Sequence, residues 1–309
     1  MSQSPAERTP YEVLGVAGSA SEDELRKAYR RRARETHPDT GGSAAAFDEV
    51  QRAWELLGTA SARAAYDRGT PASSSASASD PGATWSAAPR PPRQDSRPKA
   101  RTYGHPGGRA RERYLTMLRE WVGRGVDIPD PYNASLVRTA PPEIRRELAK
   151  ALAEEATARQ VTDLGMGFTM WSEVLAGNEG VLDHVVLGPA GLFAITSEDW
   201  GGRIQLKRGE LIGENIGPLE LPVRRTTRAA RAFAKALRVK FTGVLIVVPD
   251  NSMEDGIVAV GRGRHASTLI VQRSLLGHVL RTGIPGMAHG SLSDVFELRS
   301  VLQAGIRFP

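Results

Sequence analysis

The sequence contains no cysteine, which excludes disulfide bonds, thiol catalysis and cysteine-ligated zinc. It has no apolar run that approaches the roughly 20 residues needed to span a bilayer. The opening segment MSQSPAERTP is polar and lacks the apolar stretch of a signal peptide. We therefore expect a cytoplasmic protein with no membrane partner. Its 309 residues are enough for two or three domains.

Signatures of several enzyme classes are missing as well. The six histidines show no metal-ligand spacing, so we expect no metal site. The segment GRGRH is not followed by the Gly-Lys-Ser/Thr of a phosphate-binding loop, and no local context supports a serine–histidine–acid set. We expect no cofactor and no catalytic residues. The formal charge of +6 permits contact with nucleic acid or another acidic partner without establishing one.

Residues 1–69 carry the signals of four short helices. Thr9 and Ser21 are each followed three residues later by a glutamate, Glu12 or Glu24, and this pairing forms the capping box that begins a helix. The segment HPDTGG interrupts the second helix, because the residue before a proline disfavours helical backbone. Apolar residues at helical spacing in FDEVQRAWELL predict the third helix, and SARAAYDRG predicts a short fourth.

In their order and spacing, YEVLGV, LRKAYRRRARETHPD, FDEVQRAWELL and RAAYDRG resemble the J domain of DnaJ-type co-chaperones. The resemblance implies an all-α helical hairpin that binds a DnaK-type chaperone and stimulates its ATP hydrolysis. A cationic helix face would steer this domain toward an acidic partner and fix its orientation. The family's tripeptide and basic second helix map onto His37, Pro38 and Asp39, and onto Lys27, Arg30 and Arg31.

Residues 70–106 are expected to form a disordered linker. They contain seven proline, seven serine and seven alanine residues, a composition that cannot bury a core. The glycine/phenylalanine-rich region and the cysteine-rich zinc module of a full DnaJ are both missing from the sequence. We therefore expect the J domain to be joined to a different second domain, which selects a client or a location.

The remainder of the chain is predicted to begin with helices and to continue as an α/β domain. RARERYLTMLREWVGRG and a long helix that begins near Pro141 or Pro142 make residues 107–160 a helical segment. Over residues 161–309, β-branched runs such as LDHVVLG and GVLIVVP occur together with helical segments such as RRTTRAARAFAKALRV. This succession is typical of an α/β or mixed domain.

The strand–turn–strand LDHVVLGPAGLFAI, followed by WGG, resembles the nuclease-related domain (NERD), a branch of the restriction-endonuclease-like fold. The likeness extends over residues 155–285 and implies that Asp183, with a carboxylate-x-lysine pair on the next strand, holds a divalent metal and an attacking water. That pair falls on Thr196 and Glu198. A carboxylate and the lysine are therefore both replaced, and we expect an incomplete nuclease site.

Two interpretations of the replaced pair remain. Glu198 and Asp199 could bind a metal together with Asp183, with Lys207 returning the positive charge. Alternatively, Glu198 and Asp199 only cap a turn before Trp200, and we favour this second interpretation.

One predicted helix of the second domain carries a row of basic residues. Their spacings of four, three, four and three place them on one stripe at about 100° per residue. The stripe suits contact with the phosphates of nucleic acid. It is equally typical of the solvent-exposed face of an amphipathic helix. It consists of Arg224, Arg228, Arg231, Lys235 and Arg238.

Taken together, these patterns predict a multidomain co-chaperone that is not an enzyme. Its partners would be a DnaK-type chaperone and an unknown client protein. Two alternatives rest on the second domain: an adaptor that binds nucleic acid through the basic stripe, and a metal-dependent nuclease. Cleavage of DNA separates the nuclease from the other two, and salt-dependent binding without cleavage identifies the adaptor.

Overall fold

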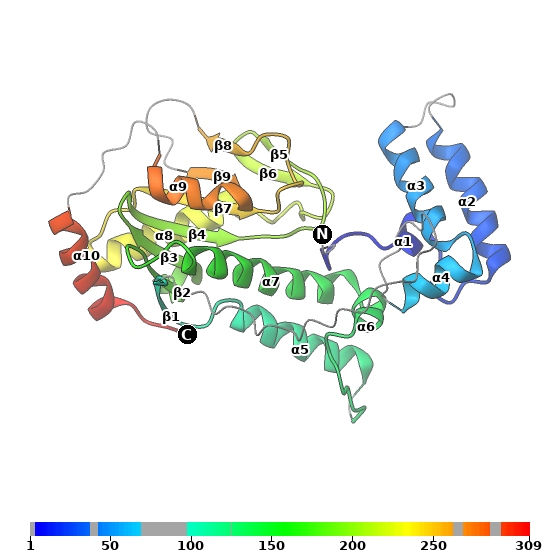
Figure 1. Cartoon of the computed structure of the whole chain (residues 1–309), viewed down its shortest axis with the longest axis horizontal. Coiled ribbons are helices and arrows are strands. Elements are labelled where there is room, and N and C mark those ends of the chain that lie inside the picture. Colours follow the sequence, from blue (N-terminus) through cyan, green and yellow to red (C-terminus); the bar gives the residue numbers. More distant parts are fainter. Residues whose placement is uncertain (1–3, 38–42, 69–97, 124, 262–267, 285–291) are drawn as a thin grey trace, which may run out of the picture. The chain divides into compact units, whose positions relative to one another are not determined.

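The computed structural model describes residues 4–37, 43–68, 98–123, 125–261, 268–284 and 292–309 (Figure 1). Its helices and strands divide into two compact units. The first unit contains four helices of residues 10–67 and one short helix of residues 134–139, and the second contains the described strands and the other helices. None of the helices in these ranges has both the length and the apolar composition that a membrane span requires.

The helices of the first unit begin where their capping signals lie. Thr9 and Ser21 each accept a hydrogen bond from the backbone N–H three residues on, and the glutamate at that position bonds back to the cap. The four helices expected in this region are present. They are α1 (Pro10–Leu14), α2 (Glu22–Thr36), α3 (Ala44–Leu57) and α4 (Ala60–Asp67).

A small apolar core joins α1, α2 and α3. Leu14, Leu25 and Leu57 are almost fully buried in it, and each such side chain contributes roughly 1.5–3 kcal/mol by burial. The rings of Tyr29 on α2 and Trp54 on α3 stack with their centroids 4.4 Å apart. Helices α2 and α3 thus form the expected hairpin, with α1 packed against both.

Polar contacts attach the last two helices of this unit. The Tyr11 hydroxyl donates to Asp67 of α4 over 2.9 Å, and Arg63 Nε donates to that hydroxyl over 3.0 Å. Helix α6 (Ala134–Thr139) falls in the segment that we expected to accompany the second domain, yet it belongs to the first unit. Its Arg138 donates to the Asp67 carbonyl over 2.9 Å. A contact between one arginine and a distant backbone carbonyl leaves no periodic signal in the sequence.

The second unit is built on one mixed seven-stranded sheet (Figure 1). Strands β3 and β4 form a tight antiparallel hairpin, whereas β4, β7 and β9 run parallel. In spatial order the strands are β1 (Arg101–Tyr103), β2 (Thr169–Leu175), β3 (Val181–Gly188), β4 (Gly191–Ser197), β7 (Gly243–Val248), β9 (Thr268–Gln272) and β8 (Ile257–Val260). A separate hairpin consists of β5 (Ile204–Lys207) and β6 (Glu210–Gly213).

Helices cover both faces of this sheet, which is why its inner strands are continuous apolar runs. On one face, α7 and α9 pack against Phe193 and Leu245. On the other face, α8 and α10 pack against Val185 and Ala194. The helices of this unit are α5 (Gly108–Val122), α7 (Pro142–Thr162), α8 (Pro222–Leu237), α9 (Leu276–Thr282) and α10 (Leu292–Gly305), with short 3₁₀ turns η2 (Gly177–Glu179) and η3 (Arg273–Leu275). The expected combination of a mixed sheet with helices is therefore confirmed.

Two boundaries differ from those expected. Residues 101–103, placed in the linker, form strand β1, which pairs in parallel with β2. Helix α7, assigned to a separate helical segment, packs on β2 and β4 and is a layer of the α/β unit itself. Composition describes an average over a segment, so a three-residue strand held by backbone hydrogen bonds escapes it.

The stability of the second unit should depend on the protonation of His184. This residue of β3 is fully buried, with Nδ1 3.0 Å from the Ser172 hydroxyl, and burial lowers the pKa of His184 from 6.5 to about 4. Between these values the unfolded chain binds a proton that the folded chain does not. The contribution of His184 to the free energy of unfolding should therefore fall as the pH drops through this window, by roughly 3 kcal/mol in total. The raised pKa of Glu154 acts in the opposite direction over part of this range, so the effect of His184 is read as a difference from a variant that lacks it.

Urea unfolding at several pH values across that window measures this dependence. The control is His184→Asn, whose amide can replace Nδ1 as the partner of Ser172 but does not titrate. Relative to this variant, the wild type should lose stability as the pH falls. Equal pH dependence in the two proteins would show that His184 is not the responsible group.

Candidate functional sites

The basic face of α2 is the first candidate site. Lys27, Arg30 and Arg31 are all exposed on this helix. Arg31 lies 3.9 Å from Glu35, one turn further along, whereas Lys27 and Arg30 form no ion pair with another described residue. Within the part of the unit that the structure describes, the charges of Lys27 and Arg30 are therefore not paired, as a surface that attracts an acidic partner requires.

His37 stands at the end of that face. It directly follows the last residue of α2, where the backbone becomes extended (φ −62°, ψ 132°). Its ring meets the Phe47 ring edge-on, with the centroids 5.1 Å apart, so the imidazole is held against α3. Pro38 and Asp39, the other two members of the tripeptide, lie outside the described residues.

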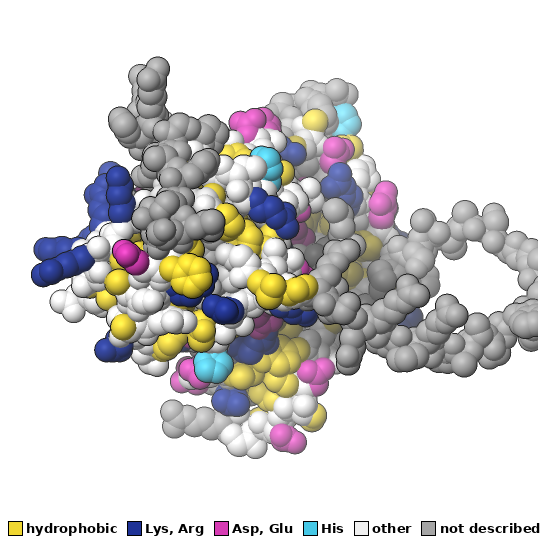
Figure 2. Space-filling model, turned by 60° about the vertical axis from the view of Figure 1, so that its left-hand side comes forward, with side chains coloured by type: hydrophobic (Ala, Val, Ile, Leu, Met, Phe, Trp, Pro, Cys, Tyr) yellow, Lys and Arg dark blue, Asp and Glu magenta, His cyan; other side chains and the backbone are white. Residues whose placement is uncertain are grey.

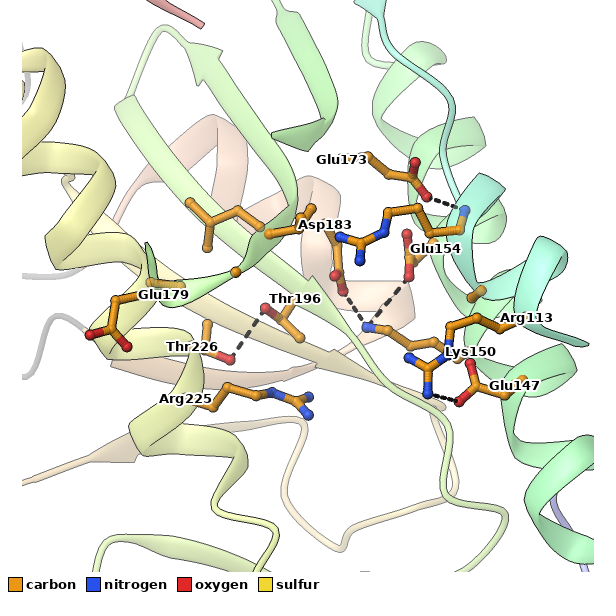
Figure 3. A pocket seen from close by; sticks show the side chains of 16 residues that line it. Arg113, Glu147, Lys150, Glu154, Glu173, Glu179, Asp183, Thr196, Arg225 and Thr226 are labelled. Carbon is orange, nitrogen blue, oxygen red and sulfur yellow. Dashed lines mark hydrogen bonds and ion pairs between the residues drawn. The ribbon is translucent and has the colours of Figure 1, made fainter. Parts of the chain in front are cut away.

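The second candidate site is a cavity of about 270 Å³ in the second unit (Figure 3). Its walls come from α5, α7, α8 and the strands β2, β3 and β4. Charged side chains of both signs line it, which distinguishes it from an apolar ligand pocket. They include Lys150, Glu154, Glu173, Asp183 and Arg225.

Lys150 of α7 lies at the centre of these side chains (Figure 3). Its Nζ donates to Asp183 of β3 and, over 2.6 Å, to the carbonyl of Ser197 at the end of β4. The same atom is 3.2 Å from Glu198 Oε1 and 3.5 Å from Glu154 Oε1. One ammonium group thus joins a helix to two neighbouring strands.

Backbone N–H groups hold the carboxylates around it. Asp183 Oδ2 accepts the N–H of the last residue of β4 over 2.8 Å. Glu154 accepts the N–H of Gly107 over 3.1 Å, and Glu173 accepts that of Arg109 over 2.7 Å. The last two donors belong to the N-terminal turn of α5, where free N–H groups and the helix dipole favour negative charge.

This arrangement imposes unusual backbone conformations on two residues. Gly107 has φ +73°, and a Cβ atom there would lie 2.6 Å from the Ala151 carbonyl oxygen of α7. Only glycine therefore lets the start of α5 approach α7 this closely. Glu173 has φ +54° within β2, a conformation that costs of order 1–3 kcal/mol for a residue with a side chain. In this strained conformation the Glu173 carboxylate accepts the hydrogen bond from the backbone N–H of Arg109 at the start of α5.

The pKa values follow from burial and from neighbouring charges. Burial, and then the charge of Asp183, raise the pKa of Glu154 to about 8. Burial also raises the pKa of Glu173. For Lys150, burial alone would lower the pKa, but the charges of Asp183, Glu198 and Glu154 outweigh it and raise the pKa above its ordinary value. Lys150 therefore remains a cation at neutral pH, and Glu154 binds a proton far more readily than an exposed glutamate does.

Only part of the set suggested by the nuclease resemblance comes together. Asp183 and Glu198 share Lys150 as their ion-pair partner. Asp199 does not join them, because its Oδ1 accepts the backbone N–H of Gly201 over 3.0 Å. The turn-cap interpretation therefore fits Asp199 but not Glu198, which binds Lys150 and Arg225.

Lys150 and Glu154 were not identified from the sequence, which predicted only a long helix in place of α7. Lys207, considered there as the replacement lysine, lies on β5 and does not line the cavity. A signal was present, because Lys150, Glu154, Thr157 and Val161 recur at spacings of four, three and four. Polar residues that continue an apolar stripe indicate buried polar partners.

The cluster suits a salt-bridge network better than a metal site. The positive charge of Lys150 already lies among three carboxylates, and Arg225 adds a second cation at Glu198. A divalent ion in that place would be repelled by the ammonium group. Within the described ranges, no group of three or more His, Asp or Glu side chains is arranged to hold a metal ion.

The basic row on α8 is exposed along its length. Arg228 pairs with Glu179 over 3.2 Å, whereas Arg224, Arg231 and Lys235 form no ion pair with another residue that the structure describes. The row is shorter than expected, because α8 ends at Leu237. Arg238 caps it with left-handed backbone (φ 55°), so its side chain does not continue the helical stripe.

Replacing Lys150 with methionine should destabilise the second unit, because Asp183 and Glu198 would remain charged with one cation fewer. Removing one partner of a buried ion pair costs up to about 5 kcal/mol. The Lys150 side chain is 21% exposed, so we expect a loss of about 3 kcal/mol at or above neutral pH.

Urea unfolding followed by tryptophan fluorescence measures this effect, since Trp171 and Trp200 are buried in the second unit. Lys235→Met removes the same charge from an exposed position and should change the stability by no more than about 0.5 kcal/mol. Adding Asp183→Asn to Lys150→Met should restore part of the lost stability. A Lys150→Met variant as stable as the wild type above neutral pH would contradict this account of the cluster.

Comparison with known proteins concerns the first unit. The chain is 51% identical over 67 residues to the chaperone protein DnaJ of Cereibacter sphaeroides (strain KD131 / KCTC 12085), which covers 20% of this chain and 18% of that relative. It is 52% identical over 67 residues to the DnaJ of Paracoccus denitrificans (strain Pd 1222), covering 20% and 17%. It is 51% identical over 61 residues to chaperone protein DnaJ 1 of Cutibacterium acnes (strain DSM 16379 / KPA171202), covering 19% and 16%.

The chain thus matches less than a fifth of the length of these curated relatives. The family model of the DnaJ domain matches residues 9–67, a range that contains α1 to α4, the exposed cations of α2 and His37. Residues 9–67 of this chain are therefore a DnaJ domain.

Proposed function

We propose that this chain is a co-chaperone that binds a DnaK-type chaperone and stimulates its ATPase through the loop His37-Pro38-Asp39. The observation that carries this proposal is the DnaJ domain itself, in which an exposed basic helix ends at His37. In this role Lys27, Arg30 and Arg31 form the docking face, and the loop completes the contact.

The physical basis of docking is charge complementarity. Opposite charges raise the rate of encounter and fix the orientation in which two proteins meet. Arg31 is partly compensated by Glu35, so Lys27 and Arg30 are expected to contribute more to docking. His37, held against Phe47, then presents its imidazole at a defined position beside the docking face.

We assign client selection, without cleavage of nucleic acid, to the second unit. If this unit has a restriction-endonuclease-like fold, its β3–β4 hairpin is the frame of the nuclease site, and the carboxylate of the second strand is replaced by Thr196. The Thr196 hydroxyl lies 3.2 Å from that of Thr226 on α8, which gives it a structural partner. Lys150 meanwhile neutralises Asp183 and Glu198. Both observations support a nuclease-like scaffold that does not act on phosphodiesters.

A second candidate function is an adaptor that binds nucleic acid. The exposed cations Arg224, Arg231 and Lys235 on α8 favour it, because phosphate contacts need uncompensated positive charge. On the face that Figure 2 presents, however, Lys and Arg side chains lie in separate groups among apolar and uncharged ones. The coloured side chains in this view do not form the continuous basic surface of a long nucleic-acid track.

His37→Gln should abolish stimulation of a DnaK-type ATPase, because the contact with the chaperone is lost. The helices of the DnaJ domain should remain intact, because the apolar core is unchanged. Arg30→Glu should weaken stimulation by reversing the charge of the docking face, and this effect should diminish at high salt. The measurement is steady-state ATP hydrolysis by DnaK with increasing amounts of the full chain.

The matched control for Arg30→Glu is Arg52→Glu, which makes the same charge change at an exposed position on α3. It should stimulate like the wild type, and circular dichroism should confirm that all three variants are folded. Undiminished stimulation by a folded His37→Gln variant would disprove the mechanism. Equal loss in Arg30→Glu and Arg52→Glu would show that only net charge matters.

Incubation of the full chain with labelled single- and double-stranded DNA and Mg²⁺ or Mn²⁺ tests the second unit. We expect no cleavage, because Lys150, which lines the cavity, is already bound to the carboxylates that a metal would need. Cleavage that disappears in Asp183→Ala would identify a nuclease. Binding without cleavage that falls steeply with salt, and weakens in Arg231→Glu, would identify the adaptor.

A further inference from the structure

A second cavity of the second unit, about 340 Å³ in volume, has a mixed lining in which apolar residues outnumber polar ones. It lies between the β5–β6 hairpin and the edge of the main sheet formed by β8 and β9. The backbone N–H of Ile204 donates to the Ser252 carbonyl over 2.7 Å, which fixes the hairpin to the segment before β8. The apolar lining residues are Ile204, Leu206, Leu211, Met253, Val258 and Ile270.

One wall of this cavity belongs to a strand with an unpaired edge. Strand β8 is the last in the sheet order and pairs only with β9. Gly256 accepts the N–H of Gln272 over 2.8 Å, and hydrogen-bonded positions alternate along an antiparallel ladder. Val258 therefore also bonds to β9, whereas the N–H and C=O groups of Ile257 and Ala259 point away from it. No backbone hydrogen bond joins these outward groups to another residue in the described part of the chain.

The approach to this edge is acidic. Residues 249–256, PDNSMEDG, contain three acidic side chains and no basic one, and Asp250, Glu254 and Asp255 are all exposed. Across the cavity, Arg203 lies 3.8 Å from Glu254, but their side chains are 82% and 91% exposed. An ion pair so exposed is weak, so segment 249–256 keeps a negative surplus in a chain of formal charge +6.

We propose that this edge binds an extended polypeptide segment, with alternating apolar residues and a flanking lysine or arginine, as an added strand beside β8. The outward N–H and C=O groups of Ile257 and Ala259 would form the main-chain hydrogen bonds. Side chains alternate between the two faces of a strand, so every second one would lie on the Val258 face, beside the cavity. The acidic segment 249–256 would attract the basic flank.

An extended segment of this kind is what an unfolded client of the proposed co-chaperone would offer. The biological role of the site, though not the binding itself, therefore rests on the proposed function. An unfolded chain exposes apolar residues that folding would bury, and it can adopt the extended conformation that strand addition requires. A folded protein offers neither feature unless it has a free edge of its own. The site therefore selects for unfolded segments by geometry as well as by hydrophobicity.

Fluorescence anisotropy of a short labelled peptide tests the site on the full chain. In this peptide valine and threonine alternate between terminal arginines. Ala259→Pro removes the outward N–H without touching the β8–β9 hydrogen bonds, and it should weaken binding about tenfold or more. Ala259→Val, the matched control, keeps the N–H and should bind like the wild type. A peptide of the same composition, with valines and threonines in separate blocks, should bind more weakly.

Met253→Lys provides a second variant, since it places a charge in the cavity and leaves the edge intact. It should also weaken binding, and hydrogen exchange of β9 should confirm that both variants keep the sheet. Equal binding to wild type and Ala259→Pro, or no binding of the alternating peptide, would overturn the inference. Self-association of the chain that Ala259→Pro abolishes would overturn it as well, because the occupant would then be a second copy.

The proposed co-chaperone function has its own readout. Ala259→Pro should stimulate the DnaK ATPase in the absence of peptide as the wild type does. If the wild type fails to stimulate but binds the peptide through β8, the co-chaperone proposal fails while the strand-addition site stands. If it stimulates normally but binds no peptide, only the strand-addition site fails.

Discussion

The ammonium group of Lys150 is the contact on which the arrangement of the second unit depends. It joins α7 to β3 through Asp183 and to the end of β4 through Ser197 and Glu198. Through Glu154, one turn further along α7, the same cluster reaches the start of α5. A partly buried charge of this kind is stabilised by the carboxylates that surround it. In return, those carboxylates are fixed at the edge of the hairpin where strands β3 and β4 separate.

That interaction also explains why the second unit is proposed here to act in recognition. Its buried carboxylates bind a lysine, and Thr196 of β4 is bonded to α8. A structural role for the cluster leaves function to other surfaces. Two of these surfaces have opposite charge: the cationic face of α2 and the acidic segment before β8. Opposite charges favour different partners, as expected for a protein that brings a client to a chaperone.

Much of the first unit was predictable because its determinants are local. The capping boxes at Thr9 and Ser21 require only residues three positions apart, and an apolar stripe needs only helical periodicity. In the second unit, the β3–β4 hairpin and β7 were equally clear, since buried strands are continuous apolar runs. Strand β1, three residues long, and helix α6, fixed by Arg138 to a carbonyl far away in sequence, have no such local pattern.

The sequence by itself determined the DnaJ domain, the basic face of α2 ending at His37 and the mixed α/β character of the rest, because each depends on short-range spacing. Only the tertiary structure decided which charges meet. It separated Glu198 from Asp199, placed Lys150 rather than Lys207 among the carboxylates, and put β8 at the edge of the sheet beside a second cavity. The physical reason is that these contacts join side chains and backbone groups from separate elements. Their geometry is fixed only when the helices pack on the sheet.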